Sequence, residues 1–291
     1  MEVRLPIFIA IFFFFSIYIG MVVPQKFGQL LPENSLKIPP YSFLANDITR
    51  EEFAEILKRA SEVYAPVVKK KLGVLHIQNG WAFDEVNAYA QRVGPLYSVT
   101  IYGGLARHPL VTRDGVLLAV CHELGHHLGG APKTRGIIFK WPSSEGASDY
   151  FASLKCFRNI VRNDDNIGII SAMEIDHGVT ERCALTYKHD DEKAICVRAA
   201  MAGKSLADLF ALEIDGGMEI SFDTPSREVV EENEDKHTDA QCRLDTYWQG
   251  ALCNRPITEE LSDRNSVDGA CHKRRGDQIG LRPACWFADS K

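Results

Sequence analysis

The residues with the clearest chemical potential are two histidines and the glutamate between them, in the run His122-Glu123-Leu124-Gly125-His126. Histidines four residues apart on a helix are separated by about 40° around the helix axis and by about one turn along it. Both imidazoles can therefore reach one tetrahedral zinc ion. Glu123 follows the first ligand directly, where it can act as a general base on water. The spacing predicts a zinc site with one Zn2+ per chain.

A third protein ligand is needed, and the residues after the motif indicate its type. A histidine in the pattern H-x-x-G-x-x-H is absent, because His126 is followed by HLGGAP. His127 is rotated by about 100° from His126 on a helix and is poorly placed to share the metal. Glu145 stands 19 residues after His126, at the start of the run EGASD. It is predicted to complete the site and to leave a fourth position for water.

Asp149 lies one helical turn beyond Glu145 on the same face of a predicted helix. We expect it to accept the free N–H of His122 and so to fix the tautomer of that ligand. The small residues Gly146 and Ala147 are expected to let the two helices approach closely. The alternative for the glutamate and the aspartate is an ordinary solvated helix face.

Residues from about 84 to 155 resemble the gluzincin family that includes HtpX, the CAAX prenyl endopeptidases and the BepA-type proteases. The resemblance rests on the run NAYA at 87–90, a strand at 97–102, Gly104-Leu105, the H-E-x-x-H helix, and a glutamate and an aspartate four apart. It implies an α+β, zincin-like fold with a helical lobe and a small sheet over the H-E-x-x-H helix. It also implies that the strand at 97–102 is the sheet edge that receives extended substrate.

The family often carries His-Pro with an arginine six residues after the histidine. His237 and Arg243 keep this spacing, without the proline. By resemblance, both residues lie over the zinc and stabilise the oxyanion of the reaction, or His237 blocks the metal in a resting form. His177 is a rival for the same role. The alternative is a surface histidine and an ordinary ion-paired arginine.

The motif residues support three hypotheses about function. The first is a zinc metalloendopeptidase that hydrolyses peptide bonds with a zinc-activated water, acting on a protein or peptide. The second is a non-catalytic envelope protein with a binding or chaperone role on a retained peptidase fold, which would not need Glu123. The third is a zinc hydrolase of non-peptide amides. A net charge of −6 argues against a nucleic-acid partner.

The N-terminus carries an apolar run at 5–23 that is long enough, as a helix, to span a bilayer. Residues 1–24 are predicted to be a cleaved signal peptide or a retained signal-anchor. The rest of the chain is then exported, to the periplasm or outside the cell, with membrane contact only through an uncleaved N-terminal segment. Residues 25–45 are expected to be a linker, and 46–291 a single metallopeptidase domain.

Eight cysteines beyond an export signal suggest disulfides, six of them after residue 180. The C-terminal part is therefore expected to be disulfide-rich. Sequence does not fix the pairing. Neighbours along the chain suggest Cys183 with Cys196, Cys242 with Cys253 and Cys271 with Cys285. Cys121 is expected to be buried or paired, with Cys156 nearest in sequence, rather than a metal ligand.

The elements that must position these residues can be placed approximately. Helices are predicted from Asp47 to about 67–71, from Asp114 to Leu128, and from 143 or 144 to about 161, with two more at 205–212 and 238–252. Strands are predicted at 74–77 and 97–102. The acidic stretch 228–236 is expected to be a loop or the end of a helix.

Overall fold

The structure is a computed structural model that describes residues 27–135 and 140–289. It is an α+β fold with one four-stranded sheet. The signal peptide or signal-anchor expected at 1–24 lies outside the described residues. Among the residues that are described, no helix is long and apolar enough to cross a membrane.

The sheet has the order β1-β3-β4-β2. Its strands are β1 (Phe27–Gln29), β2 (Val74–Gly80), β3 (Ala88–Val93) and β4 (Leu96–Tyr102). β3 and β4 form an antiparallel hairpin around Gly94, and β2 pairs with β4 in parallel. The expectation that the strand at 97–102 is a sheet edge was wrong, because β4 has a neighbour on both sides. The missed strand β3 takes the side that faces the H-E-x-x-H helix.

The first helix, α1, spans Arg50–Lys70 and begins later than predicted. Thr49, not Asp47, is its N-cap. The Thr49 side chain accepts a hydrogen bond from the backbone of Glu52, and the Glu52 side chain accepts one from the backbone of Thr49. This reciprocal capping box satisfies two backbone N–H groups that a lone aspartate two residues earlier would leave unpaired.

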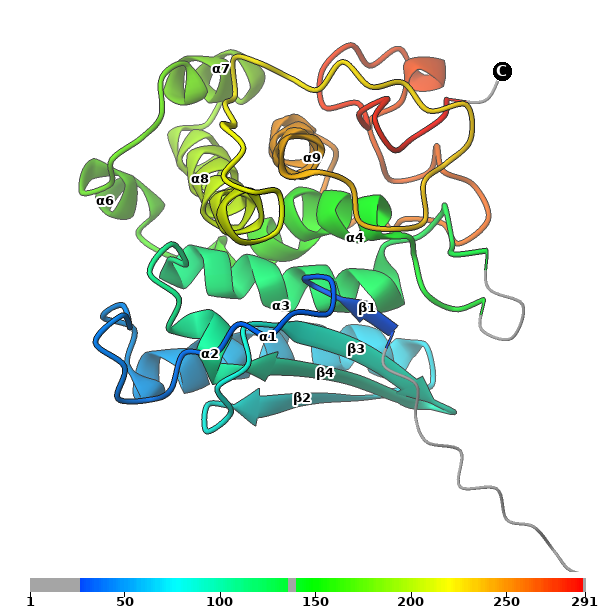
Figure 1. Cartoon of the computed structure of the whole chain (residues 1–291). Helices are drawn as coiled ribbons and strands as arrows, with labels where there is room; N and C mark the ends of the chain where they lie inside the picture. Colours follow the sequence, from blue (N-terminus) through cyan, green and yellow to red (C-terminus); the bar gives the residue numbers. More distant parts are fainter. Residues whose placement is uncertain (1–26, 136–139, 290–291) are drawn as a thin grey trace, which may run out of the picture.

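The H-E-x-x-H helix, α3, spans Arg113–Leu128 and is capped by Thr112 rather than Asp114. Every residue from Gly115 to Leu128 is buried, so the helix has no solvated face. The sheet and α1 lie on one side of α3, and further helices cover the other (Figure 1). α2 (Gly103–Ala106) follows β4 directly and lies on the sheet side. The elements on the other side are α4 (Glu145–Phe151), a π-helical turn at Ala152–Phe157, α5 (Arg158–Val161), α6 (Asn166–Ser171), α7 (Val179–Thr186), α8 (Asp190–Glu213), α9 (Ala240–Leu252) and a 3₁₀ turn at Lys273–Arg275.

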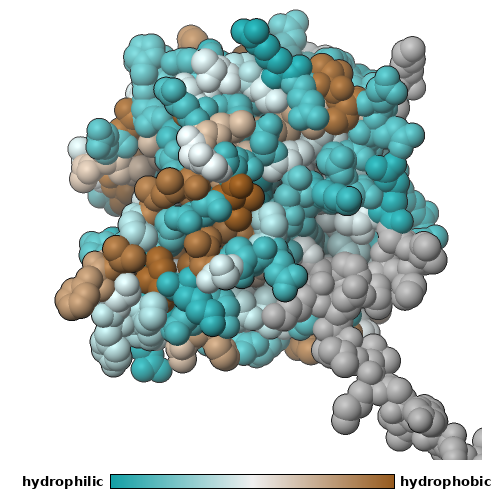
Figure 2. All heavy atoms as spheres, in the orientation of Figure 1, coloured by the Kyte–Doolittle hydropathy of each residue, from teal (hydrophilic) through white to brown (hydrophobic). Residues whose placement is uncertain are grey.

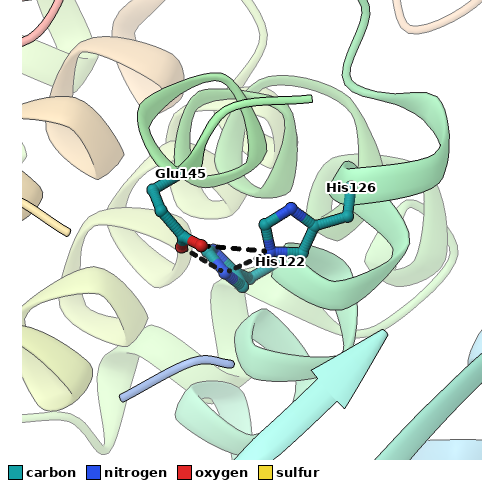
Figure 3. A group of neighbouring side chains, drawn as sticks. All are labelled: His122, His126 and Glu145. Atoms are coloured by element: carbon teal, nitrogen blue, oxygen red, sulfur yellow. Dashed lines mark hydrogen bonds and ion pairs between the residues drawn. The ribbon is translucent and has the colours of Figure 1, made fainter. Parts of the chain in front are cut away.

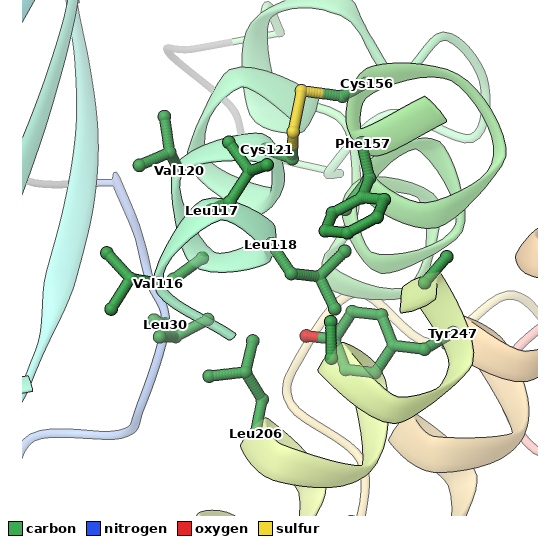
Figure 4. Close-up of a cluster of buried hydrophobic side chains, with 14 of the residues drawn as sticks. Leu30, Val116, Leu117, Leu118, Val120, Cys121, Cys156, Phe157, Leu206 and Tyr247 are labelled. Atoms are coloured by element: carbon green, nitrogen blue, oxygen red, sulfur yellow. A yellow bond between two sulfur atoms is a disulfide. The ribbon is translucent and has the colours of Figure 1, made fainter. Parts of the chain in front are cut away.

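The main hydrophobic core surrounds α3. Leu118 on α3 packs in one cluster with Phe157, Leu206 and Tyr247 from three later elements (Figure 4). The predicted helices at 144–161, 205–212 and 238–252 correspond to α4 with the two turns that follow it, to the end of α8, and to α9. A rigid, fully buried α3 is a suitable support for a site that depends on the spacing of two histidines.

Four disulfides pair all eight cysteines, and two of the suggested pairs are confirmed: Cys121–Cys156 and Cys183–Cys196. The other two suggestions were wrong, since the pairs are Cys242–Cys285 and Cys253–Cys271. Cys242 and Cys253 stand at opposite ends of α9, about 16 Å apart at a rise of about 1.5 Å per residue, which is too far for a disulfide. Complete pairing fits an oxidising environment.

Residues 25–45 were expected to be a linker, but much of their described part belongs to the sheet and the core. They supply β1, and the side chains of Leu30, Leu31 and Ile38 are buried in the core. Further along, Phe43 and Leu44 are exposed. The face of the molecule drawn in Figure 2 is largely hydrophilic, with most of its apolar side chains in the left half of the view and a smaller apolar group at the upper right.

Candidate metal centre

Helix α3 brings the two motif histidines together at their Nε2 atoms. The Nε2 atoms of His122 and His126 are 3.2 Å apart, and both side chains are buried. A tetrahedral zinc with two Zn–N bonds of about 2.0–2.1 Å places its nitrogens about 3.3 Å apart. The observed separation therefore matches a shared zinc ligand pair without rearrangement.

Helix α4, which is capped by Ser144, carries the third member of the group. Oε2 of Glu145 is 3.2 Å from Nε2 of His122, and Oε1 is 3.7 Å from Nε2 of His126. The ligand atoms of the three residues all lie within 4.8 Å of one another. Figure 3 shows the three side chains converging on one point from α3 and α4. The three residues predicted as metal ligands are thus assembled.

The close approach of α3 and α4 depends on Gly125, within the motif itself. A Cβ at this position would lie 2.7 Å from Cα of Ser148 on α4, so no larger residue fits. Gly146, which was expected to permit the approach, faces Trp286 in the C-terminal cluster instead. The H-E-x-x-H run therefore supplies the two histidines and also Gly125, whose lack of a side chain lets α4 pack close enough for Glu145 to reach them.

Asp149 and Arg243 form a buried network behind His122. Oδ1 of Asp149 is 2.6 Å from Nδ1 of His122, the contact expected from the sequence. Arg243 donates to both carboxylate oxygens of Asp149 at 2.8 Å and to the carbonyl of Leu30 at 2.6 Å. The structure thus places Arg243 against Asp149. Its direct contact is with the carboxylate that orients a ligand, and not with the ligand atoms.

The charges around His122 favour a cation at this point. Burial alone would lower the pKa of His122, but the carboxylates of Asp149 and Glu145 outweigh it and raise that pKa to about 10. Burial would raise the pKa of Glu145, yet His237, His126 and His122 hold it at about 2. Burial would likewise raise the pKa of Asp149, but Arg243 and His122 hold it below its ordinary value. Both carboxylates are therefore ionised, and they stabilise a positive charge, whether a proton or a metal ion.

His126 is held in the form that a metal ligand requires. Burial, the largest influence, lowers its pKa to about 4, so the imidazole is neutral near pH 7. Its Nδ1 lies 3.0 Å from the carbonyl of Ser143, to which it can only donate. That bond leaves the lone pair on Nε2, the atom that points at His122 and Glu145.

Glu123 is a buried carboxyl group that lacks a hydrogen-bond partner. The residue is fully buried, and neither carboxylate oxygen is hydrogen-bonded by any described residue. Burial raises the pKa of this carboxyl well above its ordinary value. A buried carboxyl group without a partner is rare in proteins, and carboxyl groups with strongly shifted pKa values cluster at functional sites. The unpaired carboxyl beside a two-histidine, one-carboxylate donor set fits a zinc site.

The two histidines considered from the sequence for stabilising the oxyanion, His237 and His177, differ in their distance from the metal group. Nε2 of His237 is 3.4 Å from Oε2 of Glu145 and 2.6 Å from the carbonyl oxygen of Gln29. His237 therefore borders the metal group. His177 is almost fully exposed and lies 3.5 Å from Asp223, outside the group.

Two residues that the sequence did not single out lie against the site. Gly28 in β1 packs onto the imidazole of His126 so closely that a Cβ built on it would overlap the ring. Gln29 provides the carbonyl that contacts His237. A three-residue strand leaves no recognisable period in the sequence. The only available signal was the glycine itself, because glycine readily adopts the positive φ that Gly28 has in the structure.

No protein-family model, curated protein or solved structure matches this chain. The site is therefore interpreted from its own geometry.

Proposed function

We propose that this chain is an exported zinc metalloendopeptidase of the gluzincin type, with a zincin-like fold. The observation that carries the proposal is the buried group of His122, His126 and Glu145 with the unpartnered carboxyl of Glu123 next to it in sequence. A binding site for a structural metal has no need of an extra buried carboxyl. A hydrolytic site needs one as a general base.

The donor set favours zinc over the other common divalent cations. Two imidazoles and one carboxylate, at separations that suit tetrahedral bonds, are the ligands of catalytic zinc. Mg²⁺ and Ca²⁺ prefer six or more oxygen ligands, which this group does not offer. Three protein ligands also leave one coordination position for water or substrate.

Each remaining polar residue has a definable role in hydrolysis. When bound, zinc would supply a Lewis acid that polarises a carbonyl and makes water acidic. Glu123 would take the proton from the attacking water and deliver it to the leaving amine. His237, beside Glu145, would donate a hydrogen bond to the substrate carbonyl as negative charge develops on it. Asp149, held by Arg243, would keep His122 in the correct tautomer.

A peptide is the substrate class that best fits the surroundings. The sheet edge next to α3 is formed by β1, a three-residue strand that pairs with β3, and extended peptides bind such edges through main-chain hydrogen bonds. Export is supported by the four disulfides and by the apolar run at 5–23.

The test is the cleavage of an unstructured protein such as casein by the oxidised full chain and by Glu123→Gln, with zinc content measured for both. Glutamine preserves size but cannot act as a base, so zinc should stay at one per chain while cleavage falls by about 10²–10⁴-fold. Glu62→Gln, on the exposed face of α1, is the matched control and should keep full activity. Measurable cleavage that is equal in wild type and Glu123→Gln would refute the mechanism. Bound zinc without cleavage, in a chain whose site is open to substrate, would favour the non-catalytic binding protein.

A further inference from the structure

The first residues that the structure describes cross the candidate site as an extended chain. β1 pairs with β3 in antiparallel register, Phe27 opposite Ala90 and Gln29 opposite Tyr89. The backbone N–H of Leu30 continues the pairing by donating to the carbonyl of Ala88 at 3.1 Å. Figure 1 shows β1 at the edge of the sheet, in front of α3. This short segment therefore occupies the only sheet edge adjacent to α3 among the described strands.

Glycine is the only residue that fits where the segment passes His126. A Cβ built on Gly28 would overlap both the Nε2 atom and the neighbouring ring carbons of His126. Gly28 also has a φ of +51°, a conformation that side chains disfavour. The backbone thus lies directly against the imidazole whose Nε2 is a predicted metal ligand.

Main-chain groups of the segment are bound one after another by polar side chains of the site. The carbonyl of Gln29 accepts a hydrogen bond from Nε2 of His237 at 2.6 Å. The carbonyl of Leu30 accepts one from Arg243 at 2.6 Å. Both the N–H and the carbonyl of Leu31 pair with the side-chain amide of Asn87, at 3.0 and 3.1 Å. Recognition of backbone rather than side chains is how a sheet edge binds peptides of varied sequence.

The two ends of the segment 27–31 differ in how much of them is buried. Leu30 and Leu31 are fully buried, and Figure 4 shows Leu30 beside Val116 in the main core. Residues 27–29 form only a three-residue strand at the edge of the sheet, with an irregular register. Edge strands of this length contribute little stability. Residues 27–29 can therefore separate from β3, with loss of the hydrogen bonds of Gln29 to His237 and Asn87, while Leu30 stays in the core.

We infer that the groove between β3 and His126 is a binding site for an extended peptide with glycine at the position facing His126, and that residues 27–29 are its resident, self-blocking ligand. The blocking half of the inference rests on the proposed peptidase function, whereas the binding half does not. Because the occupant is tethered, its effective concentration is in the millimolar range. A free peptide binds only to the fraction of molecules in which the segment has separated.

The perturbation is Gly28→Val in the full chain. The valine side chain has no room against His126, so residues 27–29 should leave the groove. The matched control is Gly94→Val in the β3–β4 turn, where φ is also positive, at +56°, but a Cβ would meet nothing within 4 Å. Any effect of positive φ alone should be the same in both variants. Circular dichroism checks that both are folded.

The first readout needs neither metal nor catalysis. A fluorescein-labelled peptide copied from residues 25–29, which end before the buried Leu30, is titrated against each protein, with fluorescence anisotropy as the signal. We expect the peptide to bind Gly28→Val at least 10-fold more tightly than it binds wild type or Gly94→Val. The same peptide with valine in place of its glycine should bind none of them. Equal binding of the labelled peptide to all three proteins, or to none, would overturn the inference.

The second readout uses the zinc-loaded proteins and the cleavage assay. Zinc removal by 1,10-phenanthroline and casein cleavage should both be at least 10-fold faster for Gly28→Val than for Gly94→Val. Cleavage is also measured for Glu123→Gln in the Gly28→Val background. Peptide binding without any Glu123-dependent cleavage would support the groove while refuting the peptidase. Cleavage that is equally fast in wild type and Gly28→Val would refute self-blocking while leaving the peptidase intact.

If Gly28→Val does not fold, hydrogen–deuterium exchange on the wild-type chain decides. A millimolar excess of the 25–29 peptide should displace the resident segment and increase deuterium uptake within residues 27–29. Residues 50–70 of α1 are the internal control and should not change. Unchanged uptake at 27–29 under saturating peptide would overturn the inference.

Discussion

Replacing Asp149 by asparagine should weaken both the fold and the metal site. The carboxylate accepts three short hydrogen bonds, one from His122 at 2.6 Å and two from Arg243 at 2.8 Å. Asparagine has nearly the same shape, but its NH₂ group would face one of these donors, and its neutral charge would leave Arg243 unpaired. The Arg243 side chain is only 2% exposed, so the unpaired guanidinium cannot be solvated.

The magnitude follows from burial of the pair. Removing one partner of a buried ion pair costs about 3–5 kcal/mol of unfolding free energy. Loss of the group that orients a metal-binding histidine lowers metal affinity by about 10–100-fold. Urea unfolding of the disulfide-intact protein with EDTA present measures the first effect without a contribution from bound metal. Competition with a zinc-sensitive dye measures the second.

The control is another arginine–aspartate pair involving α3. Asp114 accepts two hydrogen bonds from Arg198, at 2.8 and 2.9 Å, but does not contact the histidines. Arg198 also pairs with Asp164 at 3.0 Å, so Asp114→Asn should cost less, about 1–2 kcal/mol, and should leave zinc affinity unchanged. If Asp149→Asn loses under 1 kcal/mol and binds zinc like wild type, the assigned role of the network is wrong.

Two further predictions concern the support of the site. Replacing Cys121 and Cys156 together by alanine opens a loop with a sequence separation of 35 and should lower the unfolding free energy by about 4 kcal/mol. The same change at Cys183 and Cys196, whose separation is 13, should lower it by about 3 kcal/mol. Zinc affinity should fall only in the first variant, whose disulfide adjoins the motif, and equal zinc affinities in the two variants would contradict this. Burial, followed by nearby arginines, lowers the pKa of Lys155 to about 7, below its unfolded value of about 10.4. The unfolded state therefore binds more protons between these values, so wild-type stability should rise from pH 7 to 9. Lys155→Met should remove this rise in urea titrations, and an unchanged pH slope would contradict the assignment.

The metal ligands could be predicted because their spacing on regular helices determines their geometry. Histidines four apart meet on any helix, and Glu145 with Asp149 follows the same rule on the next one. The C-terminal disulfides could not be predicted in this way, because Cys285 and Cys271 follow long irregular stretches whose path depends on tertiary packing. Proximity in sequence failed for Cys242 and Cys253, which a helix holds apart.

Sequence reasoning also missed the position of the sheet edge. The alternation of β4 indicates a strand but not which strands pair with it, since pairing depends on contacts distant in sequence. β1 is too short for any periodic signal, and its proline-containing surroundings suggested a linker. Its role depends on Gly28 meeting His126, a contact between residues almost a hundred positions apart, which no local pattern encodes.

The central claim is that His122, His126 and Glu145 hold one zinc ion. The most direct test is native mass spectrometry of the oxidised full chain after zinc loading and removal of excess metal, beside His126→Ala and Glu145→Ala. We predict one zinc per wild-type chain, and loss of the bound metal in both variants. A wild-type chain without zinc, or variants that retain it as well as the wild type does, would contradict the account.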